Sequence, residues 1–85
     1  MLALRFAKSA ARGLARMPQG IARRMLGELK TIAADPAAYR GDWKPLQGSP
    51  FWRLRVGDWR VIFRVDYTAK RIAIAPVLHR REVYR

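Results

Sequence analysis

Hydrophobic and charged residues alternate along residues 51–65, FWRLRVGDWRVIFRV, with the period of two that is typical of β-strands. Gly57 and Asp58 interrupt this alternation and are typical of a two-residue hairpin turn. Such a turn sets the strand pairs Val56–Trp59, Arg55–Arg60 and Leu54–Val61. One face of the predicted hairpin is then apolar and comprises Leu54, Val56, Trp59, Val61, Phe63 and Val65. The other face carries Arg53, Arg55, Arg60 and Arg64.

The arginine face places two positive charges directly opposite each other, at Arg55 and Arg60. Like charges in this position destabilise a sheet by up to about 1 kcal/mol. Their pairing therefore indicates that an anion binds on this face. The alternative interpretation is a coating of solvated arginines.

Upstream of the hairpin, the spacing of apolar residues predicts one strand and two helices. Alternating apolar residues indicate a short strand over residues 1–6. A short helix over residues 9–16 ends before Pro18, because the residue that precedes a proline disfavours helical geometry. A second helix begins near Pro18 and ends at Asp35-Pro36. Its buried stripe comprises Ile21, Met25, Leu29 and Ile32.

The remaining segments complete the predicted order. Residues 36–50 contain Pro, Gly and Ser with little periodicity, which indicates a connection anchored on the core by Trp43, Leu46 and Tyr39. After the hairpin and a turn at residues 66–69, residues 71–77 form another strand. Pro76 cannot donate a backbone hydrogen bond, so this strand should end, bulge or lie at an edge near that residue.

A sheet with one apolar face and helices with one apolar stripe bury each other in two layers. At 85 residues the chain has the length of one small domain. The sequence therefore predicts a single α+β domain over residues 1–85. Two N-terminal helices would pack on one face of a small antiparallel sheet of about four strands, and the other face would be open to a ligand.

The net charge of the chain limits the classes of partner that it is expected to bind. With 18 basic and 6 acidic residues the formal net charge is +12, which favours a polyanion: nucleic acid first, then an anionic membrane or an acidic protein. No run approaches the roughly 20 apolar residues of a membrane helix, so an integral membrane protein is excluded. Because nucleic acid is favoured over an anionic membrane as the polyanion, no membrane partner is expected. The basic, acid-free segment before Glu28 also has the composition of organelle presequences and membrane-active helices, which stays a rival interpretation.

Several classes of catalytic site are excluded by composition. One histidine and no cysteine cannot make a convincing metal centre, and we expect neither a metal nor another cofactor. The absence of cysteine also excludes disulfides and suits a reducing compartment. No phosphate-binding glycine loop is present, and neither Ser9 nor Ser49 lies in a nucleophile motif.

The arginine face and the C-terminal tail suit the cleavage of RNA by its own 2′-hydroxyl group. This reaction needs cations that neutralise the phosphorane-like transition state, together with a base and an acid that transfer protons. His79 and Tyr84 are the candidates for proton transfer. The alternatives are a solvated His79 and a Tyr84 that docks the tail against the sheet.

The segment KPLQGSPFWRLRVGDWRVIF, followed by a strand and then HRREVYR, resembles the RelE/ParE superfamily of bacterial toxins. The similarity extends to the segment KSAARGLARMP and to the following helix, which ends in an Asp-Pro step. The resemblance therefore spans nearly the whole chain. It implies a compact α+β fold, a cytoplasmic type II toxin and a cognate acidic antitoxin that forms a hetero-oligomer with it. The RelE branch cleaves messenger RNA in the ribosomal decoding site, whereas the ParE branch poisons DNA gyrase.

The resemblance also assigns candidate site residues. The hairpin basic positions of the family fall on Arg53 and Arg55, and the arginine of its G-aromatic-R step falls on Arg60. The tail arginine and tyrosine fall on Arg80 and Tyr84. This set favours the RelE branch, because gyrase-directed relatives generally do not retain it.

One departure from the family changes the assignment of roles. Some ribosome-dependent members carry lysines on the first hairpin strand, but Arg53 and Arg55 stay protonated and cannot act as bases. The base would then be Tyr84 or His79. Arg60 would be an electrostatic clamp and Arg80 a proton donor or a stabiliser of the leaving group. The phosphate-binding residues would be Arg53, Arg55, Arg64 and Arg81.

The expected function is that of a metal-independent, ribosome-dependent mRNA endoribonuclease with the ribosome, mRNA and an antitoxin as partners. The first alternative is a gyrase-poisoning toxin. The second is a non-catalytic protein of the same fold that only binds nucleic acid or its antitoxin.

Overall fold

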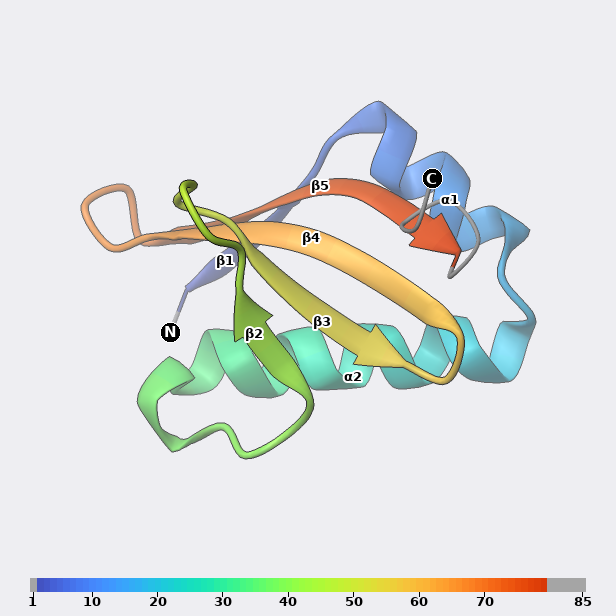
Figure 1. Cartoon of the computed structure of the whole chain (residues 1–85), viewed down its shortest axis with the longest axis horizontal. Helices are drawn as coiled ribbons and strands as arrows, with labels where there is room; N and C mark the ends of the chain where they lie inside the picture. The colour runs from blue at the N-terminus through green and yellow to red at the C-terminus, as the bar shows by residue number, and fades with distance from the viewer. Residues whose placement is uncertain (1, 80–85) are drawn as a thin grey trace.

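The structure, a computed structural model, describes the backbone of residues 2–79 and the side chains of residues 2–74. The chain forms an α+β arrangement of two α-helices and one five-stranded sheet (Figure 1). In chain order the elements are β1 (Ala3–Phe6), α1 (Lys8–Arg16), α2 (Gln19–Ala34), the short 3₁₀ helix η1 (Pro36–Ala38), β2 (Trp43–Pro45), β3 (Trp52–Val56), β4 (Trp59–Asp66) and β5 (Arg71–His79). No helix within this described part combines the length and the apolar character that a membrane crossing requires.

The strands lie in the order β1-β5-β4-β3-β2, and the sheet is mixed. β1 pairs with β5 in parallel, whereas the other neighbours are antiparallel. The expected sheet was antiparallel with about four strands. The difference comes from the parallel direction of β1 and from β2, a three-residue strand within the segment that was predicted to be a connection.

The predicted hairpin of β3 and β4 is confirmed with its register. Arg55 pairs with Arg60, and the turn between the strands is Gly57-Asp58. Gly57 has φ of +61°, a left-handed conformation that glycine adopts without the steric penalty of a β-carbon.

The predicted irregularity near Pro76 is confirmed as a bulge. Val61 pairs with Val77 and Phe63 with Ile74, so a single β4 residue lies opposite two residues of β5. β1 pairs with β5 only as far as Ile74, so Pro76 also lies beyond the part of β5 that this neighbour covers.

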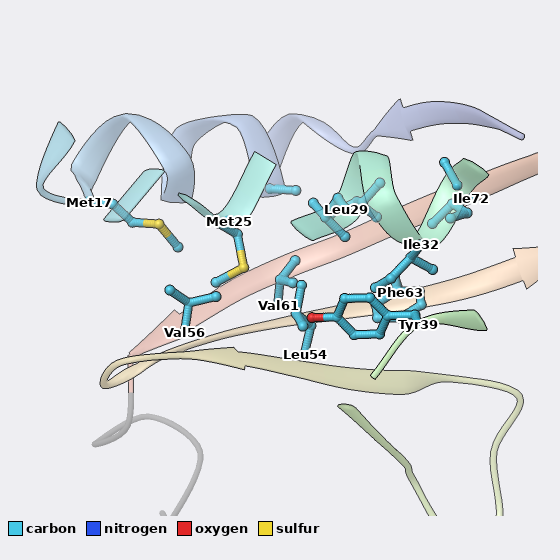
Figure 2. Close-up of a cluster of buried hydrophobic side chains, with 13 residues drawn as sticks. Met17, Met25, Leu29, Ile32, Tyr39, Leu54, Val56, Val61, Phe63 and Ile72 are labelled. Atoms are coloured by element: carbon cyan, nitrogen blue, oxygen red, sulfur yellow. The ribbon is translucent and has the colours of Figure 1, made fainter. Parts of the chain in front are cut away.

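The hydrophobic core lies between the helices and one face of the sheet (Figure 2). The stripe of α2 supplies Met25, Leu29 and Ile32, each with no exposed surface, whereas Ile21 is only partly buried. The sheet supplies Leu54, Val56, Val61, Phe63, Ile72 and Ile74. Both helices contribute to this one cluster, because Ala10 of α1 belongs to it as well.

An aromatic layer closes the core near β2. Trp43 stacks on Trp52 with ring centroids 4.3 Å apart and meets Tyr39 edge-on at 5.6 Å, so its predicted packing role is confirmed. Tyr39 is 7% exposed and hydrogen-bonds Glu28 of α2. Burial, reinforced by Glu28, raises the pKa of Tyr39 to about 12.

Candidate phosphate-binding face

The candidate site is the sheet face that points away from the helices. Residues that pair across neighbouring strands project to the same face, and alternate residues of each strand share it. The pairing places Arg53, Arg55, Arg60 and Arg64 together on the face opposite the core, as predicted. We call the set Lys44, Arg53, Arg55, Arg60 and Arg64 the basic face.

Lys44 is a member of the basic face that sequence reasoning missed. It pairs with Arg53 across the β2–β3 ladder. Hydrophobic and polar residues alternate too little around Lys44 for this segment to be identified as a strand. The sequence therefore did not assign the Lys44 side chain to a face of the sheet. The apolar residues Trp43, Leu46 and Tyr39 indicated that this segment packs on the core, but not that it forms a strand.

Asp42 contacts two arginines of the basic face and was also missed. Its Oδ1 accepts a hydrogen bond from Nη2 of Arg53 at 3.1 Å, and its Oδ2 lies 3.3 Å from Nε of Arg55. The backbone oxygen of Asp42 accepts a hydrogen bond from the amide of Arg55 at 3.0 Å. Arg55 therefore lies between a carboxylate and Arg60, which offsets part of the repulsion expected between the two paired arginines.

The arginines of the basic face differ in exposure. The side chain of Arg53 is 15% exposed, whereas half of the Arg55 side chain is exposed, and Arg64 is exposed as well. Along β4, Arg64 follows Arg60 by four residues, which corresponds to about 13 Å in a strand. A polyanion that contacts both ends of the face must therefore be extended.

Arg60 is buried, with 4% of its surface exposed, and is the one buried charged residue within the part of the chain whose side chains are described. In the sheet it lies between Arg55 of β3 and Leu78 of β5. A guanidinium group is costly to bury, and proteins retain such groups where their interactions are specific. The sequence did not indicate that this arginine of the basic face is buried.

The tail residues of the candidate site lie at the end of β5 or follow it in the chain. Arg80, Arg81 and Tyr84 lie beyond the described residues, and for His79 only the backbone is described. The backbone of His79 pairs with Trp59, one position from the Arg60–Leu78 pair. The chain therefore enters the tail at the end of the sheet where Arg60 lies.

The face is suited to a large anion. Residues 2–74 form no enclosed pocket. Within the same described part, no three histidine or acidic side chains gather in a way that would hold a metal ion. An open row of cations binds an extended polyanion more readily than a small molecule, which needs a concave site.

A second group of cations lies on α1. Lys8, Arg12 and Arg16 follow one another at intervals of four residues, so they share one side of the helix, and all three are exposed. Because α1 packs over the core face of the sheet, this group is separate from the basic face. It provides matched control positions for tests of the basic face.

Comparisons with known proteins give a family for the chain. A family model described as the ParE toxin of the type II toxin–antitoxin system matches residues 4–84. Comparison with curated protein sequences gives no match.

Solved structures share the fold along nearly the whole chain. The RelB–RelE antitoxin–toxin complex from Methanococcus jannaschii is 26% identical, with a TM-score of 0.77 over 99% of this chain and 95% of that one. The RelE–RelB complex from Pyrococcus horikoshii OT3 is also 26% identical, with a TM-score of 0.79 over 93% and 94% of the two chains. The isolated RelE toxin of E. coli, at 17% identity, has a TM-score of 0.78 over 99% and 92%.

Proposed function

Because this chain belongs to the RelE/ParE superfamily of type II toxins, we propose that it is a ribosome-dependent endoribonuclease that cleaves messenger RNA without a metal ion. The observation that carries this proposal is the basic face, which spans β2, β3 and β4 on the side of the sheet away from the core. Arginine binds and neutralises phosphate but does not act as a base at physiological pH. Such a face suits a reaction in which the RNA supplies its own nucleophile.

The proposed reaction is the attack of an RNA 2′-hydroxyl group on the adjacent phosphodiester. The bond between O2′ and phosphorus forms as the bond between phosphorus and O5′ breaks. The products are a 2′,3′-cyclic phosphate and a 5′-hydroxyl end. A base takes the proton of the 2′-hydroxyl group, and an acid gives a proton to the departing O5′.

The basic face would supply the electrostatic part of this reaction. Arg53, Arg55 and Arg64 would bind phosphates, and Arg60 would stabilise the charge that develops on the phosphorane-like transition state. Removal of one such donor typically costs on the order of 3 kcal/mol of transition-state stabilisation. The burial of Arg60 is consistent with a preorganised donor rather than with a solvated charge.

The tail would supply the proton transfers. Tyr84 or His79 would be the base, Arg80 the proton donor or the stabiliser of the leaving group, and Arg81 a further phosphate contact. The register of β5 supports this assignment, because the tail begins beside the strand position that pairs with Arg60. A tyrosine acts as a base only where cationic neighbours lower its pKa from about 10, and the tail is rich in arginine.

The proposed partners are the ribosome with its mRNA and a cognate acidic antitoxin, and the proposed location is the cytoplasm. The neighbouring structures from M. jannaschii and P. horikoshii are themselves complexes of RelE with RelB. A chain of net charge +12 is electrostatically suited to an acidic protein segment, and we propose a hetero-oligomer with one.

One observation favours a second candidate function, the poisoning of DNA gyrase. The matching family model is described as a ParE toxin, and the resemblance of this chain includes a gyrase-directed branch. The arginine and tyrosine set at Arg53, Arg55, Arg60, Arg80 and Tyr84 favours the ribosomal function.

Induced expression in bacteria distinguishes these functions. Primer extension on cellular messages should show cuts with codon periodicity, and these cuts should be weakened in Arg55→Ala but retained in Arg12→Ala. Loss of plasmid supercoiling with double-strand breaks and intact messages would instead indicate gyrase. Growth arrest with neither effect would leave a non-catalytic binding protein of this fold.

A further inference from the structure

Asp42 extends the β2–β3 ladder by one position. Trp43 pairs with Leu54, and the backbone hydrogen bond from the Arg55 amide to Asp42 continues this ladder. The Asp42 side chain therefore projects from the basic face, together with Lys44. Its place there is set by the backbone and not only by the attraction of its charge.

The Asp42 carboxylate bridges two guanidinium groups. Its Oδ1 is 3.1 Å from Nη2 of Arg53 and its Oδ2 is 3.3 Å from Nε of Arg55. A phosphate group binds a pair of arginines in the same way, with one non-bridging oxygen for each. The carboxylate thus occupies the position in which two neighbouring arginines would hold a phosphate.

We propose that Asp42 is an internal anion that competes with RNA phosphate for Arg53 and Arg55 and so lowers the affinity of the basic face for RNA. This inference rests on the proposed binding of RNA by the basic face. The competition weakens binding to any isolated stretch of RNA.

Exchange is feasible at the Asp42–Arg55 pair because both of its side chains are well exposed, whereas the Arg53 side chain is 15% exposed. Asp42 and Arg55 are 46% and 50% exposed, so a phosphate can approach both from solvent. Half-exposed ion pairs are weak and salt-sensitive, so the carboxylate can be displaced or can share its partners. A fully buried pair would not exchange in this way, because separation would leave a buried charge uncompensated.

Asp42→Asn tests this inference, since it removes the charge and keeps the shape of the side chain. The binding of the full chain to a short, fluorescently labelled single-stranded RNA with 2′-O-methyl groups, which prevent cleavage, is measured by anisotropy over a series of salt concentrations. Two unit charges about 4 Å apart in water interact by an amount equivalent to roughly fivefold in affinity. We expect Asp42→Asn to bind about fivefold more tightly at low salt, with a steeper salt dependence by up to about 0.7 in log–log slope.

Asp35→Asn is the matched control. Asp35 ends α2 and is exposed, and it lies in the helix layer. This variant has the same net charge as Asp42→Asn. We expect its affinity for the RNA to stay close to that of the wild type.

A second control tests whether Asp42→Asn changes RNA affinity through Arg53 and Arg55. In a background of Arg53→Ala with Arg55→Ala, the additional change Asp42→Asn should tighten binding much less than it does in the wild type. Thermal melting of each variant identifies any change that comes from partial unfolding.

Three results would overturn the inference: a gain no larger than that of Asp35→Asn, weaker binding by Asp42→Asn, or an undiminished gain without Arg53 and Arg55. A wild type and Asp42→Asn that both fail to bind RNA at low salt would overturn it too. Cleavage on ribosomes is measured separately, because tighter RNA binding without any cleavage would refute the proposed nuclease while the role of Asp42 stands.

Discussion

Gly41 lies against the ring of Tyr39, and we expect Gly41→Ala to destabilise the fold strongly. A β-carbon built on Gly41 would overlap Oη, Cζ and Cε2 of Tyr39. The ring cannot move inward, because Tyr39 is only 7% exposed and belongs to the close-packed core cluster. The ring must therefore swing outward, and its contacts with Trp43 and its hydrogen bond to Glu28 would be lost.

The size of this effect follows from what the ring loses. Complete removal of a buried aromatic side chain costs about 3 to 5 kcal/mol, and an outward swing retains part of the packing. The net cost of a lost hydrogen bond is about 1 kcal/mol. We therefore expect Gly41→Ala to lower the free energy of unfolding by about 3 kcal/mol, which corresponds to a fall in Tm of roughly 12 to 24 °C for a domain of this size.

Urea and thermal unfolding, followed by circular dichroism and tryptophan fluorescence, measure this change. Gly27→Ala is the matched control, because Gly27 lies within α2 and a β-carbon there would meet nothing within 4 Å. In that helix alanine is favoured over glycine by about 0.5 to 1 kcal/mol. The same chemical change should thus destabilise at one site and stabilise at the other. A Gly41→Ala protein as stable as the wild type would refute the packing described for Tyr39.

Three further results are expected. Leu29 has no exposed surface, so Leu29→Ala should lower the free energy of unfolding by about 2 to 5 kcal/mol in urea titrations. A loss below about 1 kcal/mol would contradict the central place of Leu29 in the core. Because the pKa of Tyr39 is raised in the folded state, its contribution to stability is fully present below pH 10 and is lost as pH rises to about 12. Tyr39→Phe should therefore flatten the dependence of the free energy of unfolding on pH in this range. An unchanged dependence would contradict the raised pKa of Tyr39. Arg55→Ala should weaken RNA binding and reduce by about 0.7 the magnitude of the slope of log affinity against log salt concentration. Arg12→Ala on α1 should change the affinity and this slope less. Equal effects of the two variants would contradict a localised binding face.

The hairpin was predictable because the information that specifies it is local. Alternation sets which side chains are buried, and the turn at Gly57-Asp58 sets the register, so Arg55 opposite Arg60 followed from a short segment. The stripe of α2 was predictable for the same reason, since a periodicity of three and four within one helix does not depend on distant residues.

The features that sequence reasoning missed depend on contacts between distant segments. β2 has three residues, too few for alternation to be informative, and its identity as a strand depends on pairing with β3. Without that pairing neither Lys44 nor Asp42 has a place on the basic face. The parallel direction of β1 depends on where the helices return the chain, and the burial of Arg60 depends on packing around it.

We propose that the basic face supports cleavage of mRNA by its own 2′-hydroxyl group in the ribosome. The most direct test of this proposal is a single-turnover reaction of the purified toxin with ribosomes programmed with end-labelled mRNA, followed by analysis of the new RNA ends. We predict cleavage in the decoding site that leaves a 2′,3′-cyclic phosphate and a 5′-hydroxyl end, and that is abolished in the double variant Tyr84→Phe with His79→Ala. Intact mRNA, ends that carry a 5′-phosphate, or undiminished cleavage by the double variant would contradict this mechanism.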